Sequence, residues 1–236
     1  RDLVNFDAVT CSGKASGKAF LSSAFKDPDA NAHLRIDDFK FQDGRMGVLT
    51  AFVNWNKEKQ QIDINATAND GPEATTYING YVSPEHDFID LGLSARGTYL
   101  DFMHSFTSSF ISHITGNGTG DLRLAGPLSA INLTGGLVVD GEATITPLNT
   151  TYQLRRDTLT LVYNEIMLNH QPLYDKHNNV AYVTGAIHHQ DLTNLSLDLH
   201  VDTEKFLGYD FDSFGDMSFY GTVLASGEVD IHMKGD

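Results

Sequence analysis

An internal repeat constrains the fold of this chain more than any other feature of its sequence. The segment from Ala181 to Phe206 is similar to the segment from Thr76 to Phe102. Gly80 and Gly185 lie 105 positions apart, and a single one-residue gap keeps the two segments aligned. Repetition at a fixed period is typical of proteins built from stacked structural units. A period this long predicts that each unit contains several β-strands.

A third copy of the repeat begins near the end of the sequence. Gly17, Gly120 and Gly227 each open a similar segment in which apolar and polar residues alternate. We expect one elongated domain over residues 1–236 that contains units at about 13–116 and 117–221 and the start of a third at about 222. The opening residues Arg1 to Val4 resemble the middle of a strand, so we expect the chain to be a fragment of a larger protein.

The alternation of residues predicts an antiparallel sheet with one apolar face. From Leu195 to Val201 every second residue is apolar, and polar side chains stand between them. Successive side chains of a strand point to opposite faces, so this pattern places all the apolar side chains on one face. Strands of this kind suit antiparallel sheets, whereas parallel sheets are covered on both faces. A repeated sheet can hide its apolar face in a closed sandwich or in an open, curved trough, and the alternation fits both.

The apolar side chains at the alternating positions are the candidates for lining a groove that holds apolar cargo. They are Leu34, Ile36, Ile62, Ile64, Leu91, Leu93, Leu122, Leu124, Leu159, Leu161, Tyr163, Leu195, Leu197, Leu199, Val201, Val229, Ile231 and Met233.

One stretch, residues 99–114, has the spacing of a short amphipathic helix. Its apolar residues recur at intervals of three or four, which gathers them on one side of a helix: Tyr99, Met103, Phe106, Phe110 and Ile114. The glycines of Gly116–Gly118 are expected to end the helix. Such a helix either packs on the sheet or acts as a lid at one end of the groove. The matching segment of the second unit, Leu207–Phe219, is interrupted by glycines and is expected to be a loop.

Charge and composition exclude several partners. The net charge is −15, which repels phosphate backbones and anionic lipid surfaces, so we expect no nucleic-acid binding. No apolar run approaches the roughly 20 residues of a membrane helix. Cys11 is the only cysteine, so neither an internal disulfide nor a cysteine metal cage can form.

The sequence contains no convincing catalytic or metal site. His188 and His189 are adjacent, so on a strand they point to opposite faces and do not converge on one ion together with Asp191. His170 and His177 near Asp175 also lack the three or four convergent ligands that zinc requires. The remaining acids fit no calcium loop, and no local motif supports a nucleophile or a phosphate site. We expect no enzyme activity, no cofactor and no metal.

The order of several short motifs resembles the C-terminal region of the TamB family, the inner-membrane-anchored component of the translocation and assembly module. The motifs are the Gly120–Gly126 stretch leading into Leu133–Leu137, Leu148–Tyr152, Ile166–Leu168, the Asp175–Asn179 turn, Tyr182–Gly185 with His188, and Phe219–Gly221. The resemblance covers most of the chain and is clearest from about Leu122 to Gly235.

This resemblance implies a taco-like antiparallel sheet with an apolar interior that stands in the periplasm of a Gram-negative bacterium. It implies membership of the AsmA-like, bridge-like lipid-transfer proteins, with a parent chain anchored in the inner membrane. The expected cargo is phospholipid acyl chains or nascent outer-membrane β-strands, and the expected partner is an outer-membrane barrel-assembly protein. The expected function is therefore a non-enzymatic conduit or chaperone for outer-membrane assembly and lipid transport.

Two other functional classes predict different structures. A repeat-built surface adhesin or carbohydrate-binding protein predicts exposed aromatic residues on the polar face and a closed, packed interior. A β-rich carbohydrate-active enzyme predicts a cleft in which carboxylates converge, at separations that sequence does not reveal.

Overall fold

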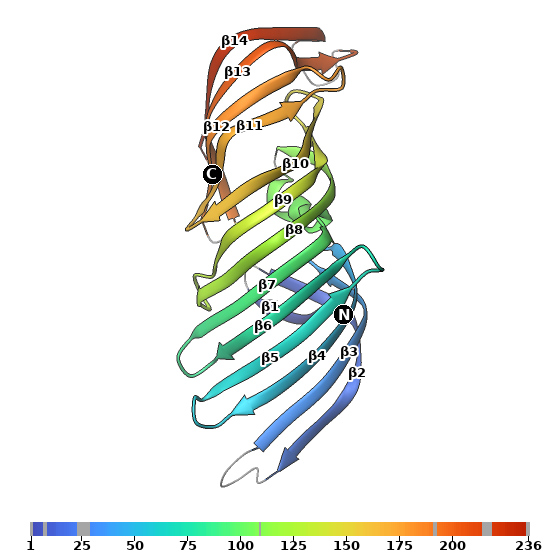
Figure 1. Cartoon of the computed structure of the whole chain (residues 1–236), viewed down its shortest axis with the longest axis vertical. Coiled ribbons are helices and arrows are strands. Elements are labelled where there is room, and N and C mark those ends of the chain that lie inside the picture. Colours follow the sequence, from blue (N-terminus) through green and yellow to red (C-terminus); the bar gives the residue numbers. More distant parts are fainter. Residues whose placement is uncertain are drawn as a thin grey trace.

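The fold is all-β, with almost no helix. The computed structural model describes residues 2–6, 9–22, 29–108, 110–190, 193–213 and 219–234. Fourteen strands form one antiparallel sheet in which each strand pairs with the next along the chain (Figure 1). The strands are β1 Asp2–Phe6, β2 Val9–Ser22, β3 Asp29–Phe41, β4 Gly44–Asn56, β5 Gln61–Asn69, β6 Thr75–Ser83, β7 Phe88–Tyr99, β8 Ile111–Pro127, β9 Asn132–Ile145, β10 Thr150–Val162, β11 Glu165–Tyr174, β12 Val180–Gln190, β13 Thr193–Phe211 and β14 Gly221–Met233.

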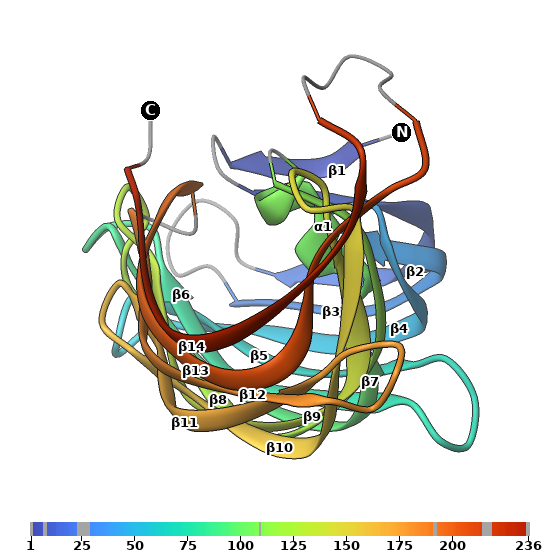
Figure 2. The ribbon, with the colours of Figure 1, turned by 90° about the horizontal axis from the view of Figure 1, so that it is seen from above.

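The sheet is long, and its strands are stacked along the long axis of the molecule (Figure 1). Seen along that axis, the strands are bent into arcs (Figure 2). The chain exposes 13788 Å² of accessible surface. A compact monomer of the same mass would expose about 10,500 Å². The excess surface is what a single sheet without a second packed layer must leave in contact with solvent.

Residues that the repeat aligns occupy strands six positions apart in the sheet. Gly80 lies in β6 and Gly185 in β12, while Gly17, Gly120 and Gly227 lie in β2, β8 and β14. One repeat of the sequence therefore corresponds to six strands of the sheet.

Glycine is required at positions 80 and 185 because the next strand approaches the backbone closely there. Gly80 and Gly185 have φ angles of +150° and +135°, which side-chain-bearing residues rarely adopt. A Cβ atom on Gly80 would lie 2.0 Å from the carbonyl oxygen of Asp90, and one on Gly185 would lie 2.1 Å from that of Asp198. The same residue type is used at both places because the backbone geometry is the same.

The helix predicted for residues 99–114 is wrong over most of its length. The structure has a 3₁₀ turn, η1 (Asp101–Met103), followed by a single helical turn, α1 (His104–Thr107). Tyr99 ends β7 and Ile114 lies in β8, where it pairs with Ala143. The backbone ladder outweighs the helical spacing here, since Ser, Thr and Phe are weak helix formers.

Two further boundaries differ from the prediction. Gly116 and Gly118 do not end a helix, because both lie inside β8 and pair with β9. Leu207 does not begin a loop, because β13 continues to Phe211 and pairs with β14 up to that residue. Gly208 does not end this strand. Gly215, the other glycine of that segment, lies outside the described residues.

The ladder between β10 and β11 is interrupted in its middle. These strands pair at Gln153–Tyr174 and again from Thr160 to Val162, and the residues of β10 between these points do not pair with β11. Pro172 lies in this interval, and proline has no N–H to donate to a ladder. The first repeat has Thr67 at the aligned position, and there β4 and β5 pair without a break. The proline and the interruption thus distinguish the second unit from the first.

Candidate functional site

Strand pairing places apolar residues in a continuous row across the sheet, from β2 to β14. Directly paired residues of an antiparallel sheet point to the same face. The row, called the central rung below, consists of Gly17, Leu34, Ala51, Ala66, Ile78, Leu93, Leu122, Gly135, Leu161, Ile166, Ile187, Leu197 and Met233. No polar side chain interrupts it.

The other predicted lining residues fall on the same face, with one exception. Ile36, Ile64, Leu91, Leu124, Leu159, Leu199 and Ile231 lie an even number of residues from members of the central rung. So do Ile62, Leu195, Val201 and Val229. We call the face that carries these side chains the apolar face. Tyr163 is the exception, because it lies in the turn between β10 and β11 and is 68% exposed.

Most large side chains of the apolar face are only partly covered. Leu93, Leu122 and Leu197 are half-buried, and Val229 and Ile231 of β14 are 49% and 38% exposed. Side chains in a closed sandwich would be buried between two sheets. In the described residues, only one sheet and the short η1–α1 segment are present.

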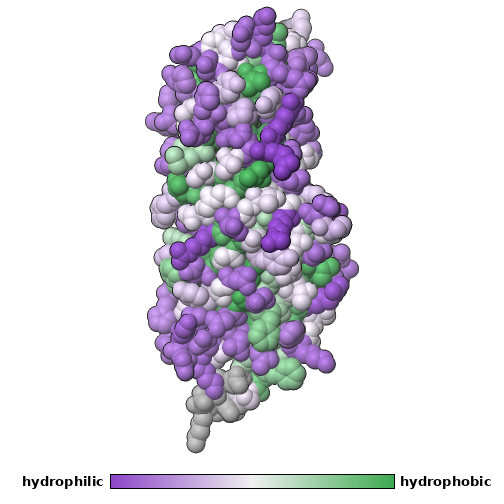
Figure 3. Space-filling model, in the orientation of Figure 1, coloured by the Kyte–Doolittle hydropathy of each residue, from purple (hydrophilic) through white to green (hydrophobic). Residues whose placement is uncertain are grey.

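The next row of paired residues lies on the opposite face and is mostly polar. It comprises Ser16, Arg35, Thr50, Thr67, Tyr77, Ser94, Asp121, Gly136, Thr160, Met167, Ala186, Asp198 and His232. The surface seen in Figure 3 is largely hydrophilic, with separate apolar patches. We call this the polar face. The two faces of the sheet therefore differ strongly in their affinity for water.

A ring contact indicates the direction in which the sheet curls. Tyr152 of β10 stacks on Phe206 of β13, with ring centroids 4.8 Å apart. Strands three positions apart in a flat sheet would be separated by roughly 14 Å. Both rings lie on the apolar face. Tyr152 pairs with Ala143 and Phe206 with Ala225, and these alanines lie an even number of residues from Gly135 and Met233 of the central rung. At these strands, the sheet bends toward its apolar face.

A buried carboxylate fastens the same region. Asp175, in the β11–β12 turn, is 1% exposed. It accepts hydrogen bonds from the backbone N–H groups of His177 (2.8 Å), Asn179 (2.8 Å) and Leu207 (2.9 Å), and from the Asn179 side chain (2.9 Å). Burial raises the pKa of Asp175, but these four bonds outweigh it and leave the pKa below its ordinary value. Asp175 thus has a structural function that the sequence did not reveal.

Tyr152 adds a second connection to β13. Its hydroxyl donates a hydrogen bond of 2.8 Å to the carbonyl oxygen of Leu207. Burial raises the pKa of Tyr152, with the nearby Asp175 charge acting in the same direction, so the phenol stays protonated and able to donate. Hydrogen bonds to Leu207 therefore connect the C-terminal part of β13 to β10, through Tyr152, and to the β11–β12 turn, through Asp175.

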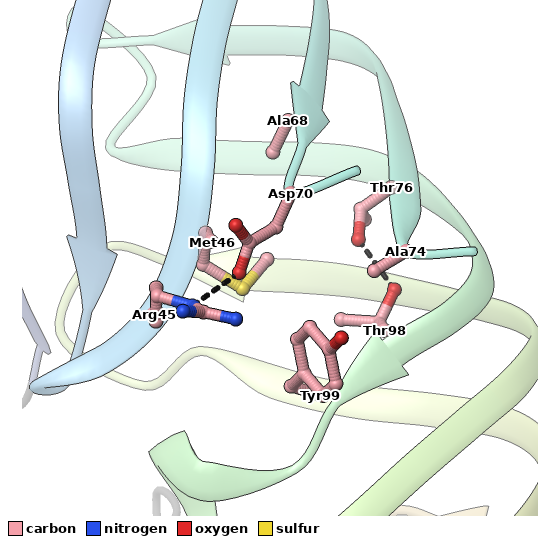
Figure 4. Close-up of a pocket in the computed structure, with 8 residues that line it drawn as sticks. All are labelled: Arg45, Met46, Ala68, Asp70, Ala74, Thr76, Thr98 and Tyr99. Atoms are coloured by element: carbon pink, nitrogen blue, oxygen red, sulfur yellow. Dashed lines mark hydrogen bonds and ion pairs between the residues drawn. The ribbon is translucent and has the colours of Figure 1, made fainter. Parts of the chain in front are cut away.

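At the first repeat, a polar cluster occupies one end of the strands (Figure 4). Arg45 bonds to the Asp70 carboxylate at 2.5 Å, and its guanidinium lies 5.4 Å from the centre of the Tyr99 ring. Thr76 and Thr98 share a buried hydrogen bond of 2.6 Å. The recess between these residues is very small, about 10 Å³, so it has no room for a ligand.

The predicted lid residues do not form one stripe. Tyr99 belongs to the cluster around Arg45, Phe110 is a buried turn residue, and Ile114 lies in a strand. The side chain of Phe106 lies outside the described residues. The η1–α1 segment instead packs on β3 and β4, where Phe102 contacts Phe41 with ring centroids 5.7 Å apart.

No cluster of metal ligands occurs among the described residues. His188 is near Glu165 (3.2 Å) on the polar face, while His189 is 5% exposed, so the two side chains differ in their surroundings as alternation predicts. His200 and His232 of β13 and β14 approach Asp230 (2.8 Å) and Asp198 (3.0 Å). Each of these pairs joins neighbouring strands. Within the ranges that the structure describes, no helix has both the length and the apolar character needed to cross a membrane.

The chain has no significant match among protein-family models, curated proteins or solved structures.

Proposed function

We propose that the chain is a non-enzymatic conduit or chaperone whose apolar face holds apolar cargo in an open, taco-like trough. The observation that carries the proposal is the central rung, which crosses β2 to β14 without a polar residue. Partial exposure of Leu93, Leu122 and Leu197 supports it, because a guest can reach these side chains. The bend of the sheet toward its apolar face also supports it.

The mechanism follows from the hydrophobic effect. Each methylene group moved out of water contributes about 0.8 kcal/mol, so an acyl chain does not cross an aqueous space without shelter. A row of aliphatic side chains offers many weak, similar contacts. Since no single contact along the row is specific, cargo can move from one strand to the next without a large barrier.

The cellular setting belongs to the same proposal and rests on the resemblance to the TamB family. In that setting the chain lies in the periplasm, as part of a parent protein anchored in the inner membrane. It delivers phospholipid, or unfolded outer-membrane protein strands, to an outer-membrane barrel-assembly partner. The polar face then contacts water while the apolar face contacts cargo.

As accounts of the apolar face, the adhesin and enzyme alternatives are supported less well. A closed interior would require the apolar face to be covered, but its large side chains are partly exposed. An enzyme of the glycosidase class would require convergent carboxylates. The buried carboxylate Asp175 has its hydrogen-bonding capacity taken up by backbone and amide donors, which leaves no oxygen directed at a substrate.

A pair of adjacent substitutions on β13 tests the proposal. Leu197 lies on the apolar face, where it pairs with Ile187 and Met233, and Ser196 lies on the polar face. Lipid retained by the purified chain would be measured by mass spectrometry for the wild type, Leu197→Asp and Ser196→Asp. We expect Leu197→Asp to lose bound lipid and Ser196→Asp to keep it.

A photocrosslinker at Leu197 separates the two kinds of cargo, since capture of phospholipid or of an unfolded outer-membrane protein identifies the guest. Capture of neither, together with no retained lipid in the wild type, contradicts the proposed function.

A further inference from the structure

On the polar face, each repeat has a solvent-exposed tyrosine at the same position of the repeat. Tyr77 of β6 and Tyr182 of β12 lie in aligned positions and are 38% and 41% exposed. Tyr77 pairs with Thr67 and Ser94, so its ring points away from the apolar face. An outward-facing aromatic ring at this place contributes nothing to the apolar face and is available to a ligand.

Tyr77 stands beside an arginine that has no acidic partner. The Arg96 guanidinium lies over the Tyr77 ring, 5.4 Å from its centre. Arg35, Arg45 and Arg123 each form an ion pair with an aspartate. Among the described residues, Arg96 forms none, although the chain carries a net charge of −15. Its donors are therefore free to bind a guest.

Tyr77 and Arg96 line a shallow cleft of about 480 Å³. The β5–β6 turn and strands β6, β7 and β8 supply its other residues, which are Pro72, Glu73, Thr75, Gly97, Asn117 and Thr119. Thr119 accepts a hydrogen bond of 2.9 Å from the Gly97 N–H, which fixes its hydroxyl at the edge of the cleft. In the described chain, the Glu73 and Asn117 side chains have no hydrogen-bond partner.

The chemistry of this cleft fits a sugar. The C–H bonds on one face of a pyranose ring pack against an aromatic ring, and its hydroxyl groups need donors and acceptors around the rim. Arg96 supplies donors, Glu73 supplies acceptors, and Asn117 supplies both. Glu73 and Arg96 cancel in charge, so the cleft suits an uncharged saccharide. A strongly anionic glycan would be repelled by the net charge of the chain.

We infer that the Tyr77–Arg96 cleft is a binding site for an uncharged oligosaccharide on the polar face, separate from the apolar face. The aligned tyrosine of the second repeat provides the natural comparison. Tyr182 stacks on the His170 ring with ring centroids 4.4 Å apart and the rings nearly parallel, whereas Tyr77 has the Arg96 guanidinium over its ring, a group that can itself bind sugar hydroxyls. Saccharide binding therefore belongs to the first repeat and does not extend to the second.

Titration with two uncharged probes, chitotetraose and cellotetraose, tests this inference by isothermal calorimetry and ligand-observed NMR. We expect saturable binding of at least one probe to the wild type. Tyr77→Ala and Arg96→Gln should each weaken binding by roughly tenfold or more, because they remove the aromatic platform or the donors. Tyr77→Phe and Tyr182→Ala should retain it.

Three results would overturn the inference: no saturable binding of either probe, equal binding by Tyr77→Ala, or loss of binding in Tyr182→Ala. Circular dichroism of each variant shows whether the sheet is intact. Arg96→Gln leaves the Tyr77 ring in place, and its predicted loss of affinity keeps the inference testable if Tyr77→Ala fails to fold. Lipid retention should be unchanged in all these variants, since the cleft lies on the other face, so this test and that of the conduit fail independently.

Discussion

Removal of the Asp175 carboxylate should open one end of the second repeat. Asp175→Ala leaves four donors without an acceptor, and the buried N–H of Leu207 cannot turn to water. Hydrogen bonds to a charged group contribute about 1.5–3 kcal/mol each, and they are not additive. The N–H groups of His177 and Asn179 lie near the surface and can bind water instead. We therefore expect Asp175→Ala to lower the free energy of local opening in this region by about 3–4 kcal/mol.

Hydrogen exchange measures this loss where it occurs. A change of about 3–4 kcal/mol raises the opening equilibrium roughly 100- to 1,000-fold. Exchange should accelerate in residues 150–154, 173–181 and 206–211, whereas β4 and β5 of the first repeat should keep their protection, because stacked units contact mainly their neighbours. Asp202→Ala is the control, since Asp202 is exposed and lies opposite Glu228. Equal acceleration throughout the sheet, or none anywhere, would refute the reasoning.

The contribution of Asp175 should also depend on pH. Its pKa in the folded chain lies below the unfolded value of about 3.9, so its stabilisation is complete above that pH. The stabilisation is lost as the pH falls through the folded pKa. Accordingly, the difference in stability between the wild type and Asp175→Ala should be constant from neutral pH to about pH 5 and should shrink below about pH 4. A difference that persists at the lowest pH would contradict this assignment.

Three further predictions concern the rest of the sheet. Gly185→Ala should lower the free energy of unfolding, measured in urea, by more than about 1 kcal/mol, because the backbone angle at Gly185 and the neighbouring carbonyl exclude a Cβ atom. Gly136→Ala is the control and should have a smaller effect, because a Cβ atom at Gly136 meets no atom within 4 Å. The pKa of His200 should lie above its ordinary value, mainly because of the Asp230 hydrogen bond, and NMR titration of Asp230→Asn should show a lower pKa; an unchanged pKa would exclude this cause. Pro172→Thr should restore a donor between β10 and β11 and increase exchange protection of residues 168–173, and unchanged protection would show that the proline does not cause the interruption.

The sequence predicted the sheet well because alternation and strand pairing depend on the same two-residue period. Leu195 to Val201 alternate in the sequence, and β13 places those side chains on one face. The repeat likewise carries real geometric information, since Gly80 and Gly185 share a backbone angle and a close contact with the next strand.

Features that depend on contacts between distant strands could not be predicted. The spacing from Tyr99 to Ile114 fits a helix, but only the finished sheet reveals that β7 extends to Tyr99 and that β8, paired with β9, begins at Ile111. The function of Asp175 depends on the N–H of Leu207, 32 residues away. Arg96 lies within the aligned segment Thr76–Phe102, but nothing in the sequence predicts that it lies over the Tyr77 ring, 19 positions away.

The central claim is that one face of the sheet holds apolar cargo, and site-specific photocrosslinking tests it most directly. A crosslinking amino acid would be placed at Leu93, Leu122 and Leu197 of the central rung, and at their sequence neighbours Ser94, Asp121 and Asp198 on the polar face. We predict that each position of the central rung captures acyl chains or unfolded strand peptide, and that each neighbouring position does not. Equal capture on both faces, or none at the central rung, would contradict the account.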